Sequence, residues 1–153
     1  MSEGAILLAD AAATAALGAR LAPLLGVGDV VTLSGPLGSG KTSLARGVLA
    51  ALGLAGEAPS PSFPIVIAYA PPEVRLPLWH VDLYRLESAD EARELGLDEA
   101  AEEAALLVEW PERLGAAAWP QALALRLDVT DDGGRCLTWR APEAWGRRWP
   151  PSP

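Results

Sequence analysis

Residues 35–42 read Gly35-Pro36-Leu37-Gly38-Ser39-Gly40-Lys41-Thr42, and this stretch decides the fold. It matches the pattern G-x-x-x-x-G-K-[ST] at every fixed position, the signature of a loop that wraps around phosphate groups. Such a loop needs a buried strand before it and a helix after it. The apolar residues 29–34 supply the strand, and residues 41–52, ended by Gly53, supply the helix. The sequence therefore predicts a strand–loop–helix unit.

The residue types in this loop suit phosphate chemistry. Glycines let backbone N–H groups turn inward around phosphate oxygens, and the following helix adds the positive end of its dipole. Lys41 is expected to reach the β- and γ-phosphates, and the Thr42 hydroxyl to bind Mg²⁺. The chain contains eleven Arg but a single Lys, and that Lys stands at the position the motif requires. We therefore expect a nucleotide with its magnesium ion here.

The remaining patterns extend this unit to an α/β fold. Helices are predicted at residues 11–25, 87–95 and 98–104, and strands at 5–9, 65–69, 76–83, 105–110, 123–129 and 135–140. Short connections predict antiparallel hairpins at 65–83 and 123–140. We expect a phosphate-loop NTPase with a mixed, mainly parallel central sheet flanked by helices. Residues 1–141 form its single domain, and residues 142–153 form a Pro/Trp-rich C-terminal tail, interpreted as frayed.

Composition limits the function classes. The chain has 153 residues, a net charge of −8 and a pI near 4.6, which argues against direct nucleic-acid binding, so any connection with RNA should be indirect. No apolar run reaches the roughly 18 residues of a membrane span, and the first residues lack the basic region of a signal peptide. A lone Cys136 favours the reducing cytoplasm.

Two acidic residues are candidates for the metal side of the site. Glu109 ends the apolar run 105–109, and Asp82 ends the run 78–82. A phosphate loop commonly works with a carboxylate at the end of a neighbouring strand, so both are predicted to take part. His80, the single histidine, and Trp110 are interpreted as packing residues.

Four motifs in order resemble the TsaE family (formerly YjeE), the bacterial ATPases of tRNA threonylcarbamoyladenosine synthesis. They are the phosphate loop, Ser60-Pro61-Ser62-Phe63, His80-Val81-Asp82-Leu83-Tyr84-Arg85-Leu86 and Val108-Glu109-Trp110-Pro111-Glu112. The resemblance runs from about Leu8 to Leu137. It implies a Mg²⁺-dependent ATPase with a low intrinsic rate, stimulated by the partner proteins TsaD and TsaB, which modify adenosine 37 of tRNA.

The resemblance also implies residue roles. Lys41, Asp82 and Glu109 would be catalytic, with Thr42 and Glu109 binding Mg²⁺. Residues 60–63 would act as a switch near the γ-phosphate, where Ser62 stands in place of the family's Thr and keeps the hydroxyl without the methyl. Motif and resemblance together predict a set of residues that bind ATP or ADP: Gly35, Pro36, Leu37, Gly38, Ser39, Gly40, Lys41, Thr42, Ser43 and Arg135.

Two other functions use the same loop. A small-molecule or nucleotide kinase usually needs an Arg-rich lid, whereas arginines here are scattered singly until Arg147-Arg148. A GTP-binding switch usually recognises guanine through an Asn-Lys-x-Asp element. The chain has no Asn and its one Lys lies in the phosphate loop, so ATP is favoured over GTP.

Overall fold

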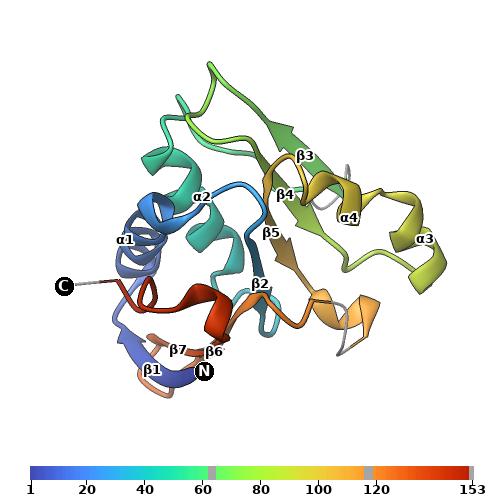
Figure 1. The fold of residues 1–153 in the computed structure, drawn as a ribbon. Coiled ribbons are helices and arrows are strands. Elements are labelled where there is room, and N and C mark those ends of the chain that lie inside the picture. Colours follow the sequence, from blue (N-terminus) through green and yellow to red (C-terminus); the bar gives the residue numbers. More distant parts are fainter. Residues whose placement is uncertain (62–64, 116–118, 152–153) are drawn as a thin grey trace.

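The structure, a computed structural model, describes residues 1–61, 65–115 and 119–151. At its centre the described strands form one sheet in the order β1-β7-β6-β2-β5-β4-β3 (Figure 1). The strands are β1 (Ser2–Leu8), β2 (Val30–Ser34), β3 (Val66–Tyr69), β4 (Leu78–Asp82), β5 (Ala105–Glu109), β6 (Leu123–Val129) and β7 (Arg135–Ala141). The α-helices are α1 (Ala11–Leu21), α2 (Lys41–Ala51), α3 (Ala89–Glu94) and α4 (Leu97–Ala100), and the 3₁₀ helices are η1 (Ala22–Leu24), η2 (Pro111–Leu114) and η3 (Glu143–Trp145).

The centre of the sheet is parallel and its edges are antiparallel. Strands β6, β2, β5 and β4 run in one direction. Strand β3 pairs antiparallel with β4, and β7 pairs antiparallel with both β6 and β1. The mixed sheet and both hairpins are therefore confirmed. Because the parallel strands share a direction, the carboxyl ends of β2, β4, β5 and β6 all lie at the same end of the sheet.

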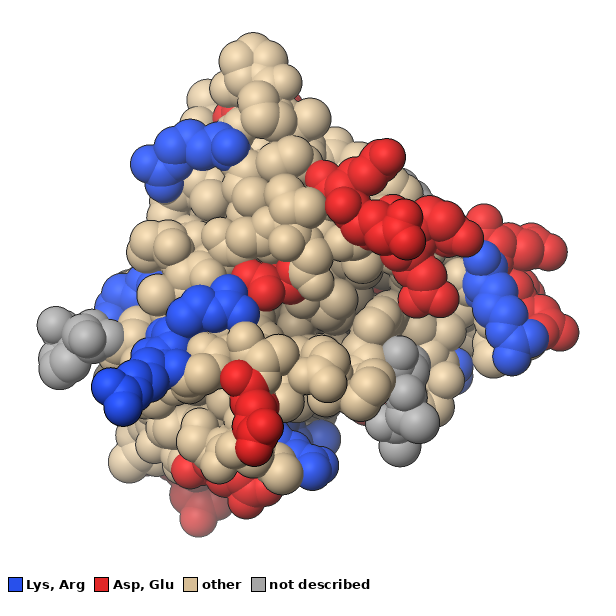
Figure 2. All heavy atoms as spheres, viewed as in Figure 1, with Lys and Arg blue, Asp and Glu red and all other residues tan. Residues whose placement is uncertain are grey.

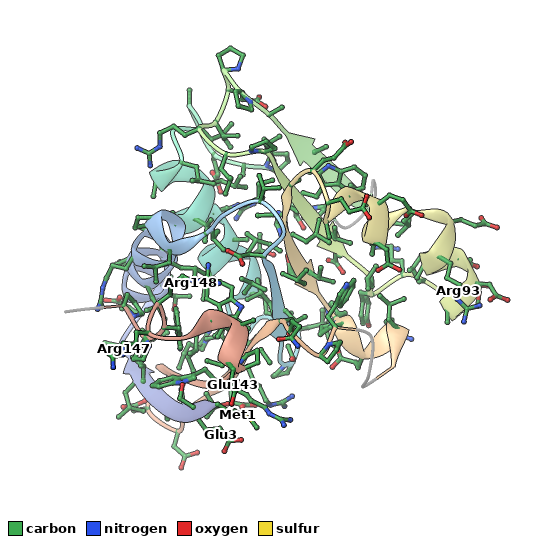
Figure 3. All side chains as sticks on the ribbon, viewed as in Figure 1. Met1, Glu3, Arg93, Glu143, Arg147 and Arg148 are labelled. Atoms are coloured by element: carbon green, nitrogen blue, oxygen red, sulfur yellow. The ribbon has the colours of Figure 1, made fainter. Side chains whose placement is uncertain are left out.

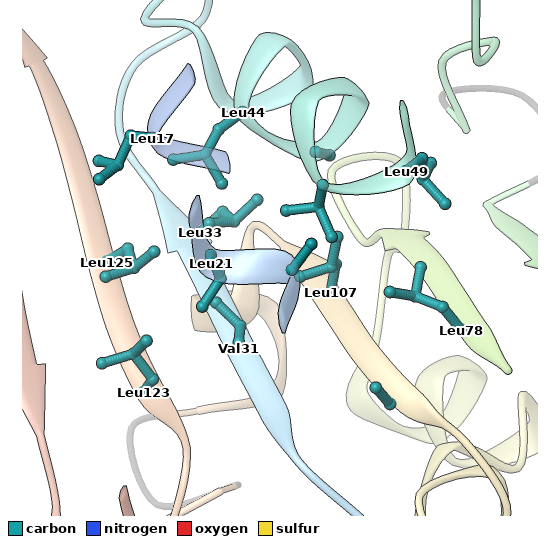
Figure 4. Packing of buried hydrophobic residues seen from close by; sticks show 14 of the residues in the cluster. Leu17, Leu21, Val31, Leu33, Leu44, Leu49, Leu78, Leu107, Leu123 and Leu125 are labelled. Atoms are coloured by element: carbon teal, nitrogen blue, oxygen red, sulfur yellow. The ribbon is translucent and has the colours of Figure 1, made fainter. Parts of the chain in front are cut away.

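Alternating side chains divide the core between the two faces of the sheet. One face packs against α1 and α2, where Leu17 and Leu44 meet Leu33 and Leu125 (Figure 4). The second face packs against α3, α4 and η2 through a separate cluster that includes Leu106 and other buried residues: Val81, Leu83, Leu86, Ala92, Leu97, Ala100 and Val108. Near-continuous burial of β2 and β5 is what a two-sided parallel sheet requires.

Two helices end earlier than the sequence pattern predicts. The α-helix that begins after the Asp10 cap ends at Leu21 and continues as η1, because Pro23 cannot donate the backbone hydrogen bond of an α-helix. The helix predicted at 98–104 covers only Leu97–Ala100, and the chain continues in tighter turns, in which Glu102 N–H donates to the Glu99 carbonyl and Glu103 N–H to the Ala100 carbonyl. Within the described ranges, no helix has both the length and the apolar character needed to cross a membrane.

The C-terminal segment packs onto the domain, so the expectation of a frayed tail is wrong for residues 143–150. Trp145 and Trp149 are 1 % and 2 % exposed and belong to the core on the α1 side. Arg148 turns inward and donates to both Asp29 carboxylate oxygens, at 2.6 and 3.1 Å, whereas Arg147 is exposed (Figure 3). The two buried tryptophans hold this segment in place, although its apolar residues follow neither a helical nor a strand spacing.

Candidate nucleotide and metal site

The phosphate loop connects β2 to α2 as the motif predicts. Strand β2 ends at Ser34 and α2 begins at Lys41. Gly35 has φ +135° and a Cβ there would overlap the Leu127 carbonyl oxygen, while Gly40 has φ +105° at the start of the helix. Glycine is required at both places because L side chains rarely adopt these angles. The loop therefore keeps the backbone shape that binds phosphate.

Lys41 lies inside the loop. Its side chain is 5 % exposed and its Nζ donates to the carbonyl oxygens of Gly35 at 2.7 Å and Pro36 at 3.0 Å. Nζ also lies 4.4 Å from the centre of the Trp110 ring. Burial lowers the pKa of Lys41, and the negative charges of Glu109 and Asp82 oppose that shift. The ammonium group is thus held at one point between the loop and two carboxylates.

Arg135 fixes the outer side of the same loop. From the start of β7, its guanidinium donates to the carbonyl oxygens of Ser39 at 2.9 Å and Gly38 at 3.1 Å. It also donates to the carbonyls of Gly133 and Gly134 in its own hairpin, both at 2.9 Å. The described contacts therefore tie the loop to the β6–β7 hairpin, and direct contact of Arg135 with ATP stays a prediction.

The two candidate carboxylates end neighbouring parallel strands. Asp82 is the last residue of β4 and pairs in register with Glu109, the last residue of β5. Glu109 is 2 % exposed, and both of its oxygens lie 3.4 Å from the Thr42 hydroxyl. Asp82 accepts a hydrogen bond from Tyr84 N–H at 2.9 Å. Burial raises the pKa of Asp82, the Tyr84 N–H opposes this, and the Glu109 charge adds to it.

Thr42 and Glu109 suit a magnesium ion. Two adjacent oxygen ligands of an octahedral Mg²⁺, with bonds of about 2.1 Å, lie about 3 Å apart. The 3.4 Å between the Thr42 hydroxyl and the Glu109 oxygens is close to that spacing. Hydroxyl and carboxylate oxygens are also the donors that Mg²⁺ prefers, with phosphate and water completing its shell. The residues present therefore fit the ion that the motif predicts.

These groups line a single cavity of about 270 Å³. Its walls are formed by the loop residues from Leu37 to Ser43 together with Asp82, Glu109 and Trp110. A larger cavity of about 480 Å³ lies elsewhere, beside Thr32 and Arg140. The titratable groups converge in the smaller cavity, at the carboxyl ends of the parallel strands, and this position identifies it as the candidate site.

The predicted switch is only partly described. Ser60 and Pro61 lie in the loop that leads to β3, and Ser62 and Phe63 lie outside the described residues. Before it, Arg46 on α2 donates to the Ala58 carbonyl at 2.7 Å. After it, the Asp82 N–H donates to the Ile65 carbonyl at 2.8 Å. The described residues that flank the segment therefore contact α2 on one side and a candidate catalytic residue on the other.

Two contacts of the site were missed by the sequence analysis. His80 is buried, as a packing residue would be, but its Nε2 also lies 2.6 Å from Glu109 Oε2. Trp110 has φ +59° and places its indole between Lys41 and the Tyr84 ring, whose centroid is 4.8 Å away. The spacing of His80 could have indicated its contact with the site. It lies two residues before Asp82, so both side chains face the same side of β4.

Comparisons with known proteins identify the family that the chain resembles. The family model "Threonylcarbamoyl adenosine biosynthesis protein TsaE" matches residues 8–137. Two proteins called tRNA threonylcarbamoyladenosine biosynthesis protein TsaE are similar in sequence. The one from Mycobacterium tuberculosis H37Rv is 42 % identical over 142 residues, 88 % of this chain and 82 % of that protein. The one from Streptomyces coelicolor is 45 % identical over 115 residues, 73 % of this chain and 76 % of that protein.

A solved structure extends the likeness to the fold. The crystal structure of Bacillus subtilis YdiB superimposes with a TM-score of 0.75 at 31 % sequence identity. The match covers 92 % of this chain and 86 % of YdiB. The residues that the family model matches include the phosphate loop and both carboxylate-bearing strands. The chain therefore belongs to the TsaE family.

Proposed function

We propose that this protein is a Mg²⁺-dependent ATPase that serves the biosynthesis of N6-threonylcarbamoyladenosine at position 37 of tRNA. The observation that carries the proposal is the convergence of Lys41, Thr42, Asp82 and Glu109 on one cavity at the phosphate loop. The names of the TsaE relatives supply the pathway. The loop supplies the reaction, in which water attacks the γ-phosphorus of ATP and ADP leaves.

Each residue has a separate task in this reaction. Lys41 places its positive charge on the β- and γ-phosphates as charge develops on them. Thr42 and Glu109 would hold Mg²⁺, which would supply positive charge to neutralise the phosphates. Asp82, whose buried carboxylate faces the same cavity, positions the attacking water or completes the metal shell. The four side chains come from three elements that the parallel sheet brings to one edge.

The C-terminal segment argues against the alternative that the protein is a kinase. Arg147-Arg148 was the one place where arginines cluster in the sequence. Arg148 is tied to Asp29 and to the Leu24 carbonyl at 3.0 Å. An arginine held there against the core does not serve as a mobile lid over a phosphate acceptor. Hydrolysis by water remains the reaction that this site supports best.

A partner protein is proposed to raise the rate. Among the described residues that line the cavity, Lys41 is the one positive side chain. The Arg135 guanidinium is occupied by four carbonyl oxygens. Phosphoryl transfer gains roughly 10³-fold or more when a further positive group reaches the γ-phosphate. We therefore assign slow turnover to the isolated chain and stimulation to the TsaB–TsaD complex.

Surface charge favours indirect contact with tRNA. Acidic side chains gather on the side of the molecule that carries α3 and α4 (Figure 2). The exposed acidic residues of this region are Glu87, Asp90, Glu91, Glu94, Asp98, Glu99, Glu102 and Glu103. Such a surface repels the phosphate backbone of RNA. ATP hydrolysis should therefore respond to the protein partners and not to tRNA by itself.

The test is ATP turnover by the purified protein alone, with tRNA alone, and with the purified TsaB–TsaD complex. We expect slow hydrolysis in the first two reactions and stimulation of at least about 10-fold in the third. A reaction with the partner complex and no TsaE chain serves as the control. Full-rate hydrolysis by the isolated chain, or stimulation by tRNA without partners, would contradict the proposal.

A further inference from the structure

His80 lies directly beneath the metal-side carboxylate. In the parallel pairing of β4 with β5, His80 stands opposite Leu107 and Asp82 stands opposite Glu109. His80 is therefore the diagonal neighbour of Glu109 on the same face of the sheet. Its side chain is fully buried, and its Nε2 lies 2.6 Å from Glu109 Oε2. This is a direct hydrogen bond between two buried side chains.

The second ring nitrogen indicates which atom carries the proton. His80 Nδ1 is buried and has no hydrogen-bond partner among the described residues. An N–H at Nδ1 would be a buried donor without an acceptor, which is costly in a protein interior. A bare Nδ1 lone pair avoids that cost and leaves the proton on Nε2. With the proton there, His80 donates to Glu109, whose ionised carboxylate can only accept.

We propose that His80 is a positioning residue for Glu109: its ring donates from Nε2–H to Oε2 and fixes the carboxylate that faces Thr42 and would bind the metal. The proposal rests on the Mg²⁺ role proposed above for Glu109. Rotation of the carboxylate would break the hydrogen bond to His80, so the ring holds it in one orientation before nucleotide arrives. Donors of this kind are known to tune the metal affinity of the ligands that they orient.

The tautomer can be read directly, because the chain contains a single histidine. Nitrogen NMR of the free protein labelled with ¹⁵N-histidine, at neutral pH without nucleotide or metal, gives one ring to assign. We expect a protonated Nε2 and an unprotonated Nδ1. A ring that carries its proton on Nδ1, on both nitrogens, or in rapid exchange between the two would overturn the proposal.

Substitutions test the effect on the metal. His80→Gln keeps a donor at the position of Nε2, whereas His80→Met has similar length and no donor. The readout is binding of a fluorescent ADP analogue, titrated with Mg²⁺ and repeated in excess EDTA. We expect His80→Met to raise the Mg²⁺ concentration for half-maximal enhancement on the order of 10-fold, and His80→Gln to stay within about 3-fold of the native protein. Binding in EDTA should be unchanged in both.

Controls separate positioning from packing. Leu107→Met alters the buried cross-strand neighbour of His80 without touching its hydrogen bond, and should leave the Mg²⁺ dependence unchanged. Equal losses in His80→Gln and His80→Met, or losses that persist in EDTA, would assign His80 to packing and overturn the proposal. The NMR result does not depend on ATP hydrolysis. If the tautomer is as expected but Mg²⁺ has no effect on nucleotide binding by the native protein, the proposed metal role of Glu109 fails instead.

Discussion

Asp82 and Glu109 end neighbouring strands in matching register, yet their surroundings differ. Glu109 is held by two side chains, the His80 ring at 2.6 Å and the Thr42 hydroxyl at 3.4 Å. Among the described contacts, the Asp82 carboxylate accepts a hydrogen bond from the Tyr84 backbone N–H, and burial of its charge raises its pKa. Equivalent positions in a parallel sheet therefore give two carboxylates with different hydrogen-bond partners.

This difference assigns separate tasks to the two groups. Glu109 is hydrogen-bonded to His80 and faces the Thr42 hydroxyl at about the distance that separates two ligands of one Mg²⁺ ion. Such a carboxylate suits a permanent metal ligand. A carboxylate with a raised pKa, whose own N–H donates to the Ile65 carbonyl two residues after the predicted switch, suits a group that acts on water.

The largest effect is expected when the positive charge that both carboxylates face is removed. Lys41→Ala should lower ATP turnover at least ~100-fold, because it takes a preorganised charge from the transferred phosphoryl group. Lys41→Met, which keeps an unbranched aliphatic side chain without the charge, should lose as much. Phosphate release measures the rate, and urea unfolding checks that both variants fold. Turnover near the native level in a folded variant would contradict the site assignment.

The next effect isolates Asp82. Asp82→Asn keeps the acceptor for the Tyr84 N–H but removes the charge, so the maximal rate at saturating Mg²⁺ should fall roughly 10- to 100-fold. Affinity for ADP should change little, because the phosphates contact the loop. Steady-state kinetics and ADP titration measure the two quantities. An unchanged maximal rate would remove Asp82 from the mechanism.

Arg135 provides a smaller effect that involves neither carboxylate. Arg135→Met removes the donors that hold the Gly38 and Ser39 carbonyls, so the loop loses part of its preorganised shape. ADP affinity should weaken on the order of 10-fold, with or without Mg²⁺. Arg140→Met, at the far end of β7, is the control and should bind normally. Equal affinities for ADP in the two variants would show that the Arg135 hydrogen bonds do not shape the loop.

The smallest effect is on stability and follows from the sign of the pKa shift. Because the pKa of Asp82 is raised above 3.8, its charged form costs folding free energy at neutral pH, and this cost disappears as pH falls toward 3.8. Asp82→Asn should therefore stabilise the free protein at pH 7 by up to about 1 kcal/mol, with a smaller gain near pH 4. Urea unfolding at both pH values measures the gain.

Asp132 is a control with the opposite sign. The Thr130 hydroxyl and the Gly134 N–H hold the pKa of its carboxylate below 3.8. Its contribution is thus stabilising at neutral pH and is lost as pH falls below 3.8. Asp132→Asn should destabilise the protein slightly at pH 7. Stabilisation by both substitutions would indicate a general charge effect and not the burial of Asp82.

The parts of the fold that rest on local patterns were predictable from the sequence. The loop motif placed β2 and α2, and the bounds of β6 follow directly from its alternating residues. Helix ends were less predictable, because the apolar spacing runs past both of them: Pro23 ends α1 by lacking an N–H donor, and tight turns follow α4. The packed tail was not predicted, since Trp145 and Trp149 bury themselves in a core that depends on the finished sheet.

The site divides in the same way. Lys41, Thr42, Asp82 and Glu109 were named from a motif and from the ends of apolar runs, and the structure brings them together. The contacts that orient them depend on strand order and register, which the sequence pattern does not specify. His80 meets Glu109 because β4 and β5 are parallel neighbours, and Arg135 meets the loop because β6 lies between β7 and β2.

The most direct test of the separate roles is a Mg²⁺ titration of ATP hydrolysis by Glu109→Gln and Asp82→Asn, run side by side with the native protein. We predict that Glu109→Gln shifts the Mg²⁺ concentration for half-maximal activity upward by on the order of 10-fold or more. Asp82→Asn should keep the native midpoint and reach a lower plateau. Two curves that superimpose, in midpoint and plateau alike, would contradict the account.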